Sequence, residues 1–164
     1  MKIMTEVSIN KQARLSEHFT LAEMCKTSAK TQDGNIPSHV HIENLKRLCG
    51  WLEMLRSEWN KRYGEGDDPI VINSGYRSEA VNKAVGGVSG SNHLTGCAAD
   101  IRVAGIEQLV RYATILLDIS DESQEDFDEL LLERSPRGGY WLHFAVRPPS
   151  QENRRKVSLI QSLR

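Results

Sequence analysis

Two short segments, AADIRV at residues 98–103 and WLHFAV at residues 141–146, determine how this chain is expected to fold. Both alternate apolar residues with others, which is the pattern of strands that bury one face only. In the first segment Asp100 falls on the face opposite the apolar residues, and in the second His143 does the same. The two segments therefore predict a sheet with one face on a core and metal-binding residue types on the other.

Two longer segments have the residue spacing of amphipathic helices. The apolar residues of segment 45–59 recur every three or four positions, and so do those of segment 106–117. Gly64 is expected to end the first of these helices. Thr20 and Ser78 have the sequence context of helix N-caps and predict two shorter helices.

Further β-rich runs at residues 69–73 and 129–133 complete the expected sheet. The order of elements predicts an α+β domain with a small, mainly antiparallel sheet and flanking helices. The length fits one domain over residues 1–164, with residues 1–14 as a flexible tail. Residues 154–160, a charged segment followed by a short apolar run, are expected to belong to a C-terminal tail.

The composition excludes several classes of partner. The net charge is −1, and Lys and Arg are interspersed with Asp and Glu, which argues against nucleic-acid binding. No apolar run approaches the length of a membrane span, and the N-terminus lacks the apolar stretch of a secretory signal. We therefore expect a monomer that is cytoplasmic as synthesised and acts on the cell wall only if released. The 3 cysteines predict reduced, partly buried thiols.

The candidate metal ligands are His93, Asp100 and His143. Two imidazoles and one carboxylate form a common ligand set for catalytic zinc, with the fourth position left to water. His93 lies in a loop seven residues before Asp100. Both can approach one ion only if the chain turns sharply, and Gly96 permits such a turn. Taken singly, each of these residues also has an ordinary structural explanation, and only their combination favours a zinc site.

A carboxylate is also needed as general base, and Glu133 is the candidate. If the hairpin of the last two predicted strands is symmetric about Gly138, Glu133 lies opposite His143 with the Cβ atoms ~5 Å apart. There it could accept a proton from water and pass it to the leaving amine. Glu129, on the same face, is the alternative base, and a strand-end ion pair is the structural alternative for Glu133. Arg77 is the best-placed cation for stabilising an oxyanion or binding substrate.

Together these residues resemble the zinc D-alanyl-D-alanine carboxypeptidases and L-alanyl-D-glutamate endopeptidases. The resemblance spans about residues 15–147 and rests on SGYRS at 74–78, S-x-H-x-x-G-x-A-x-D at 91–100 and W-x-H at 141–143. It implies one zinc ion on His93, Asp100 and His143, a substrate- or oxyanion-binding Arg77, and the fold shared with the hedgehog signalling domain.

The resemblance is to the compact phage or prophage subgroup, in which the catalytic glutamate ends the strand before W-x-H; this position is Glu133. Many relatives carry that glutamate three residues before the tryptophan, where this chain has Gly138. The resemblance also implies that Ser91 binds substrate, and strand parity places Trp141 on the face of His143, where it could line the cleft as a substrate-binding residue or support the ligand. The expected substrates are peptidoglycan peptides, and the expected role is that of a phage-type endolysin. A non-catalytic zinc-binding module of the same fold and a cytoplasmic dipeptidase are the alternatives.

Overall fold

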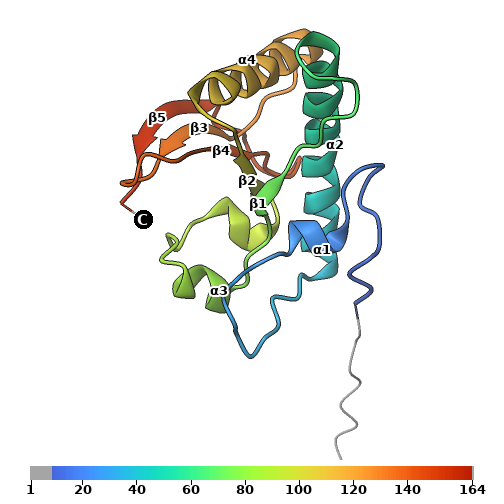
Figure 1. Ribbon diagram of the computed structural model, residues 1–164. Coiled ribbons are helices and arrows are strands. Elements are labelled where there is room, and N and C mark those ends of the chain that lie inside the picture. Colours follow the sequence, from blue (N-terminus) through green and yellow to red (C-terminus); the bar gives the residue numbers. More distant parts are fainter. Residues whose placement is uncertain (1–8, 164) are drawn as a thin grey trace, which may run out of the picture.

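A five-stranded sheet lies at the centre of the protein in the computed structural model, which describes residues 9–163 (Figure 1). The strand order is β1-β2-β4-β3-β5, and all neighbouring strands are antiparallel except β3 and β5. The α+β class and the mainly antiparallel sheet are as predicted. The strands are β1 (Ile72–Ser74), β2 (Ala98–Arg102), β3 (Glu129–Arg134), β4 (Tyr140–Ala145) and β5 (Lys156–Gln161).

The two predicted N-caps, Thr20 and Ser78, are present, and Ser38 caps the longest helix. Thr20 and Ser38 each form a capping box, and the Ser78 hydroxyl accepts a hydrogen bond from the amide of Val81. None of the helices within residues 9–163 has both the length and the apolar composition that crossing a membrane requires. The helices are α1 (Leu21–Met24), α2 (His39–Arg62), α3 (Glu79–Ala84), the 3₁₀ helix η1 (Asn92–Thr95) and α4 (Ile106–Ser123).

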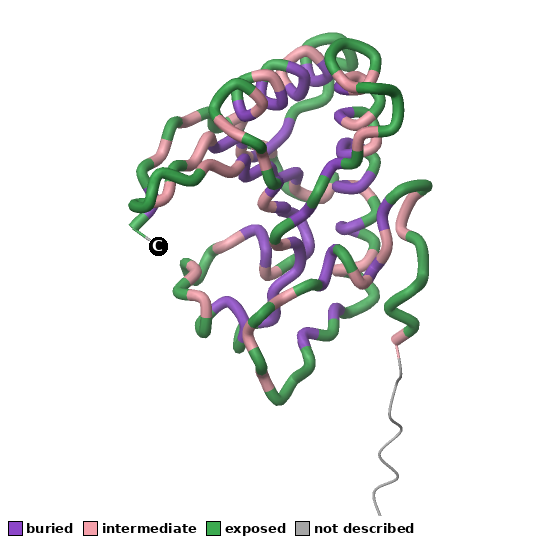
Figure 2. Tube along the Cα trace, in the orientation of Figure 1, coloured by how far each residue is buried: buried purple, intermediate pink, exposed green. Residues whose placement is uncertain are grey.

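The two long helices cover one face of the sheet and leave the other face to the functional site. Ile101, Leu142 and Phe144 are fully buried beneath α2 and α4, and the Trp51 and Phe144 rings lie 5.4 Å apart. Figure 2 shows this buried layer between exposed outer surfaces. The opposite face, which carries Asp100 and His143, turns toward η1 and α3. The alternation in the sequence thus separates the core from the site.

The predicted register of the β3–β4 hairpin is wrong. The structure pairs Glu133 with Trp141, and His143 lies opposite Leu131. The turn spans residues 135–139, and Gly138 supplies a left-handed residue with φ of 86° near its end. Longer hairpin loops usually place such a residue after a type I turn, so the glycine lies off centre. Glu133 is therefore two residues farther along the hairpin from His143 than expected, although on the same face of the sheet.

Both predicted tails differ from the structure. Residues 156–161 form strand β5, parallel to β3 at the sheet edge. The missed strand has Val157 48% and Leu159 78% exposed, so its sequence lacks a buried periodic face. At the other end, the carbonyl groups of Lys11 and Ala13 accept hydrogen bonds from the first residues of α1, so this part is held against the domain. The rest of the expected N-terminal tail, residues 1–8, lies outside the described residues.

Candidate active site

The three expected metal ligands converge on one point. Asp100 on β2 and His143 on β4 are directly opposite each other in the antiparallel pair. The Asp100 Oδ1 atom lies 3.0 Å from His143 Nδ1 and 3.3 Å from His93 Nε2. One ligand atom from each residue lies within 4.8 Å of the other two, a spacing that fits a shared metal ion. Strand pairing therefore supplies two ligands, and η1 supplies the third.

Contacts at both ends of the short helix η1 hold His93 at this point. The Ser91 hydroxyl caps it by accepting a hydrogen bond from the His93 amide at 3.2 Å. Gly96 ends it with φ of 73°, and a Cβ there would lie 2.6 Å from the carbonyl oxygen of His41. Only glycine meets both conditions without strain. The sharp turn predicted between His93 and Asp100 is thus present.

The hydrogen bonds of His93 suit metal binding. Its Nδ1 lies 2.6 Å from the carbonyl oxygen of Gly75. Because a carbonyl only accepts hydrogen bonds, Nδ1 carries the proton and Nε2 presents its lone pair toward Asp100. A backbone partner of this kind fixes the tautomer and the ring orientation of metal-ligating histidines. The donor set therefore fits a divalent ion such as zinc.

A second carboxylate orients His143. Its Nδ1 faces Asp100, while its Nε2 lies 3.3 Å from Glu129 Oε1. The side-chain amide of Asn92 donates to the same Glu129 oxygen at 2.7 Å and to Asp128 Oδ2 at 2.8 Å. Asn92 precedes His93 on η1, so this amide ties the helix that carries one ligand to the strand that supports the other.

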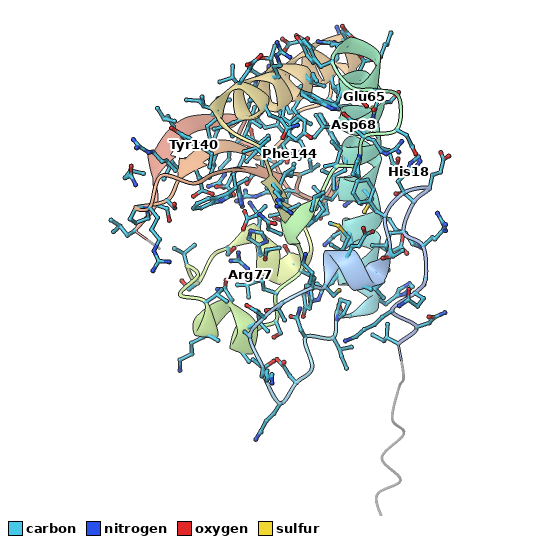
Figure 3. The ribbon with its side chains drawn as sticks, viewed as in Figure 1. His18, Glu65, Asp68, Arg77, Tyr140 and Phe144 are labelled. Carbon is cyan, nitrogen blue, oxygen red and sulfur yellow. The ribbon has the colours of Figure 1, made fainter. Side chains whose placement is uncertain are left out.

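Arg77 contacts the candidate metal ligand Asp100 directly. Its Nε donates to the Ser74 hydroxyl and its Nη2 to Asp100 Oδ2, both at 2.9 Å. The guanidinium therefore holds the carboxylate oxygen that faces away from the histidines, which leaves Oδ1 for an ion. Arg77 is 8% exposed and lies between the sheet and α3 (Figure 3).

Burial and neighbouring charges set the protonation of the site. Burial would raise the pKa of Asp100, but the adjacent His93 and the hydrogen bond to His143 outweigh it and hold that pKa below its usual range. Burial lowers the pKa of His93. For His143 burial also favours the neutral form, yet the hydrogen bonds to Asp100 and Glu129 raise its pKa to about 9. A metal ion binds neutral imidazoles, so it competes with protons for His143.

These groups line a cleft of about 480 Å³. One wall is the sheet, which contributes Glu129, Leu131, Glu133 and Trp141. The indole Nε1 of Trp141 donates to Glu133 Oε2 at 2.7 Å, so the tryptophan orients the candidate base. The other wall is the loop of residues 85–91, which contributes Val85, Gly87, Val88, Gly90 and Ser91.

The structure thus brings together every candidate site residue of the sequence analysis. Sequence reasoning did not anticipate two of their contacts: Ser91 caps η1, and Arg77 donates a hydrogen bond to Asp100. Sequence reasoning missed three further residues around Glu129. Asn92 lies inside the S-x-H motif and Asp128 directly precedes β3, which were the available signals, whereas nothing in the sequence marked Arg154.

Two imidazoles and a carboxylate around one point, with further carboxylates and a guanidinium in the same open cleft, are an arrangement typical of metal-dependent hydrolases. The chain belongs to the peptidase M15 family, whose sequence profile matches residues 17–119. It is also similar to the zinc D-Ala-D-Ala carboxypeptidase of Streptomyces albus G, with 32% identity over 84 residues. The matched stretch is 51% of this chain and 31% of that relative, so the match covers less than a third of the relative's length.

The family match includes only part of the site. Arg77, His93 and Asp100 lie within residues 17–119, whereas His143 and both glutamates follow that range. The β2–β4 pairing connects the two parts, because it sets Asp100 opposite His143.

Proposed function

We propose that this protein is a zinc-dependent peptidase that hydrolyses an amide bond in peptidoglycan stem peptides. The observation that carries the proposal is the convergence of His93, Asp100 and His143 in a cleft that also contains Glu133. Membership of a peptidase family and the similarity to a zinc carboxypeptidase support the reaction and the metal.

The chain's own residues have distinct roles in this proposal. A bound zinc ion supplies Lewis acidity, which polarises the scissile carbonyl and acidifies water. Glu133 takes the proton of the attacking water at a carboxylate oxygen and transfers it to the leaving amine. Arg77 stabilises negative charge on the carbonyl oxygen as it develops. Ser91 and Trp141 flank the substrate in the cleft.

The choice of Glu133 over Glu129 as base rests on their partners. Glu129 contacts His143 and the Asn92 amide, and the hydrogen bond to His143 lowers its pKa. A carboxylate held in this way supports a ligand and is a weak base. Glu133 accepts from the Trp141 indole and lines the cleft, which suits proton transfer to and from a ligand there.

The biological role that we propose is that of a phage-type endolysin. This part rests on the resemblance of the sequence motifs to the compact phage and prophage subgroup. Mass analysis of the products from intact sacculi and from a soluble pentapeptide ending in D-Ala-D-Ala identifies the bond that is cut. Release of stem peptides from sacculi supports the lytic role, whereas cleavage of the soluble peptide alone contradicts it.

The test of the mechanism is Glu133→Gln, with the exposed α4 residue Glu122→Gln as the matched control. We expect Glu133→Gln to bind one zinc ion per chain by elemental analysis and to lose about 10²-fold or more of its hydrolysis rate. The control should retain both properties. A Glu133→Gln protein that binds zinc and degrades sacculi at the parental rate contradicts the mechanism. A zinc-loaded parent that releases no product from either substrate supports instead the non-catalytic zinc module.

A further inference from the structure

Arg154 reaches the active-site cleft from outside the family match. It lies in the segment between β4 and β5 and lines the same cleft as the metal-ligand cluster. Its Nε and Nη2 donate to the two oxygens of Asp128 at 2.9 and 2.7 Å, and its backbone amide donates to Asp128 Oδ1 at 3.1 Å. Asp128 is fully buried, so a guanidinium bonded to it in this bidentate way is held in one orientation.

The remaining edge of this guanidinium is open to the cleft. Among the described residues, no partner contacts Nη1 of Arg154, and the side chain is 48% exposed. Its Nη2 lies 3.7 Å from Glu129 Oε2, and Glu129 contacts His143. Two contacts, through Glu129 and His143, therefore connect this guanidinium to the point where the ligand atoms converge.

The other guanidinium of the cleft is engaged differently. Arg77 bonds to Asp100 and Ser74, and its side chain is 9% exposed. With a divalent ion in the site, this ion and the two guanidiniums face the three carboxylates of Asp100, Glu129 and Glu133. Asp128, which pairs with Arg154 from outside the lining, brings these charges into balance, and Arg154 is the cation that presents an open donor to the cleft. An anionic group on the ligand would find its hydrogen-bond donor there.

We propose that Arg154 is a substrate-binding residue that recognises a free carboxylate close to the scissile amide bond. This inference rests on the proposed function and adds the substrate class, namely peptides that carry a carboxylate beside the bond that is cut. Two sources share this chemistry: the C-terminal carboxylate of a soluble peptide and the carboxylate of an acidic residue within a longer one. A planar guanidinium with a fixed orientation binds either of them.

Arg147 provides a matched control. Its Nε lies 3.2 Å from Asp128 Oδ2, so Arg147 pairs with the same buried carboxylate as Arg154. It lines a different cavity, beside Trp51 and Pro149. Arg147→Met and Arg154→Met therefore both remove one cation from Asp128, but only the second changes the charge of the active-site cleft.

The experiment compares the zinc-loaded parent and both zinc-loaded variants on three substrates. These are a peptide with free carboxylates, the same peptide with an amidated C-terminus, and the same peptide with its acidic residue amidated. We expect Arg154→Met to raise KM about tenfold for the free peptide with little change in kcat. For the amidated peptide that lacks the recognised carboxylate, we expect the KM of Arg154→Met to equal that of the parent. The amidated peptide that gives this result identifies which carboxylate Arg154 binds. Arg147→Met should leave KM unchanged for all three peptides. The KM increase should shrink at high salt.

Equal KM increases for free and amidated peptides, or an equal effect of Arg147→Met, overturn the inference while leaving the peptidase proposal intact. Calorimetry on the zinc-loaded Glu133→Gln protein separates the two proposals, because it measures peptide binding without turnover. If the parent hydrolyses no peptide but binding of the free peptide still weakens about tenfold on Arg154→Met, the reaction is wrong and the carboxylate site stands. If Arg154→Met does not weaken that binding, the inference is wrong.

Discussion

Replacing Asp128 with Asn should destabilise the protein by about 3 kcal/mol. The carboxylate is fully buried and accepts hydrogen bonds from Arg154 and Asn92, with Arg147 also within ion-pair distance. Asparagine keeps the shape but removes the charge and turns an NH₂ group toward these donors. Removing one partner of a buried ion pair costs ~3–5 kcal/mol, and the partial exposure of both arginines favours the lower end.

The measurement is urea and thermal unfolding of the parent and the variant. For a chain of this length, ~3 kcal/mol lowers Tm by about 10 °C and the urea midpoint by about 1.5 M. The control is Asp126→Asn, whose side chain is 59% exposed and pairs with Arg155 at 3.0 Å. An exposed pair contributes about 0.5 kcal/mol, so this variant should unfold close to the parent. If the two variants unfold within experimental error of each other, Asp128 does not have the structural role described above.

Further predictions concern pH, metal binding, backbone strain and thiol chemistry. Burial would raise the pKa of Asp128, but the hydrogen bonds from the neighbouring arginine and amide outweigh it and lower that pKa. The contribution of Asp128 to the free energy of unfolding is therefore complete above the unfolded pKa of ~4 and is lost as pH falls toward the lower folded value. Asp128→Asn should flatten the acid limb of a stability–pH curve, and an unchanged limb would contradict this. Glu129→Gln should weaken zinc binding about tenfold in competition with a chelating dye, because it removes the anionic partner of His143; equal affinity would show that the contact does not matter. Gly96→Ala should cost ~2 kcal/mol or more in the same unfolding assay, since φ is 73° and the new methyl group would meet a backbone oxygen at 2.6 Å. Burial raises the pKa of the Cys49 thiol to about 12, so it should react with a disulfide reagent only when the protein unfolds, and rapid labelling of the native state would refute this.

The elements that the sequence predicted correctly are those that bury one regular face. The spacing of leucines predicted α2 and α4, and the alternation predicted β2 and β4, because burial imposes those periods. α4 nevertheless extends to Ser123, beyond the last residue of the apolar pattern at position 117, and Gln124 ends it with φ of 58°. Strand β5 was missed because an exposed edge strand needs no apolar alternation. The hairpin register depends on the conformation of one turn, to which the apolar pattern is insensitive.

The residues of the candidate site also divide into those that the strand pattern predicted and those that it could not predict. Asp100 and His143 could be predicted as neighbours of one site because each breaks the apolar pattern of a strand on the same face. Arg154 could not, because its importance depends on a contact with a residue 26 positions away in the chain, and Asn92 was marked only by its place inside the S-x-H motif. Glu129 was recognised only as an alternative base, since its contact with His143 depends on the true strand register.

The two walls of the cleft differ in what they can discriminate. The sheet wall holds ionised groups at fixed positions, whereas the facing wall of residues 85–91 offers mainly glycine and valine. Such a facing wall has few directional contacts and limits a bound chain chiefly by its bulk. A ligand in the cleft would therefore be oriented by the ionised groups of the sheet wall together with Arg77 and Arg154, and branched or cross-linked groups would be accommodated against the glycine- and valine-rich wall.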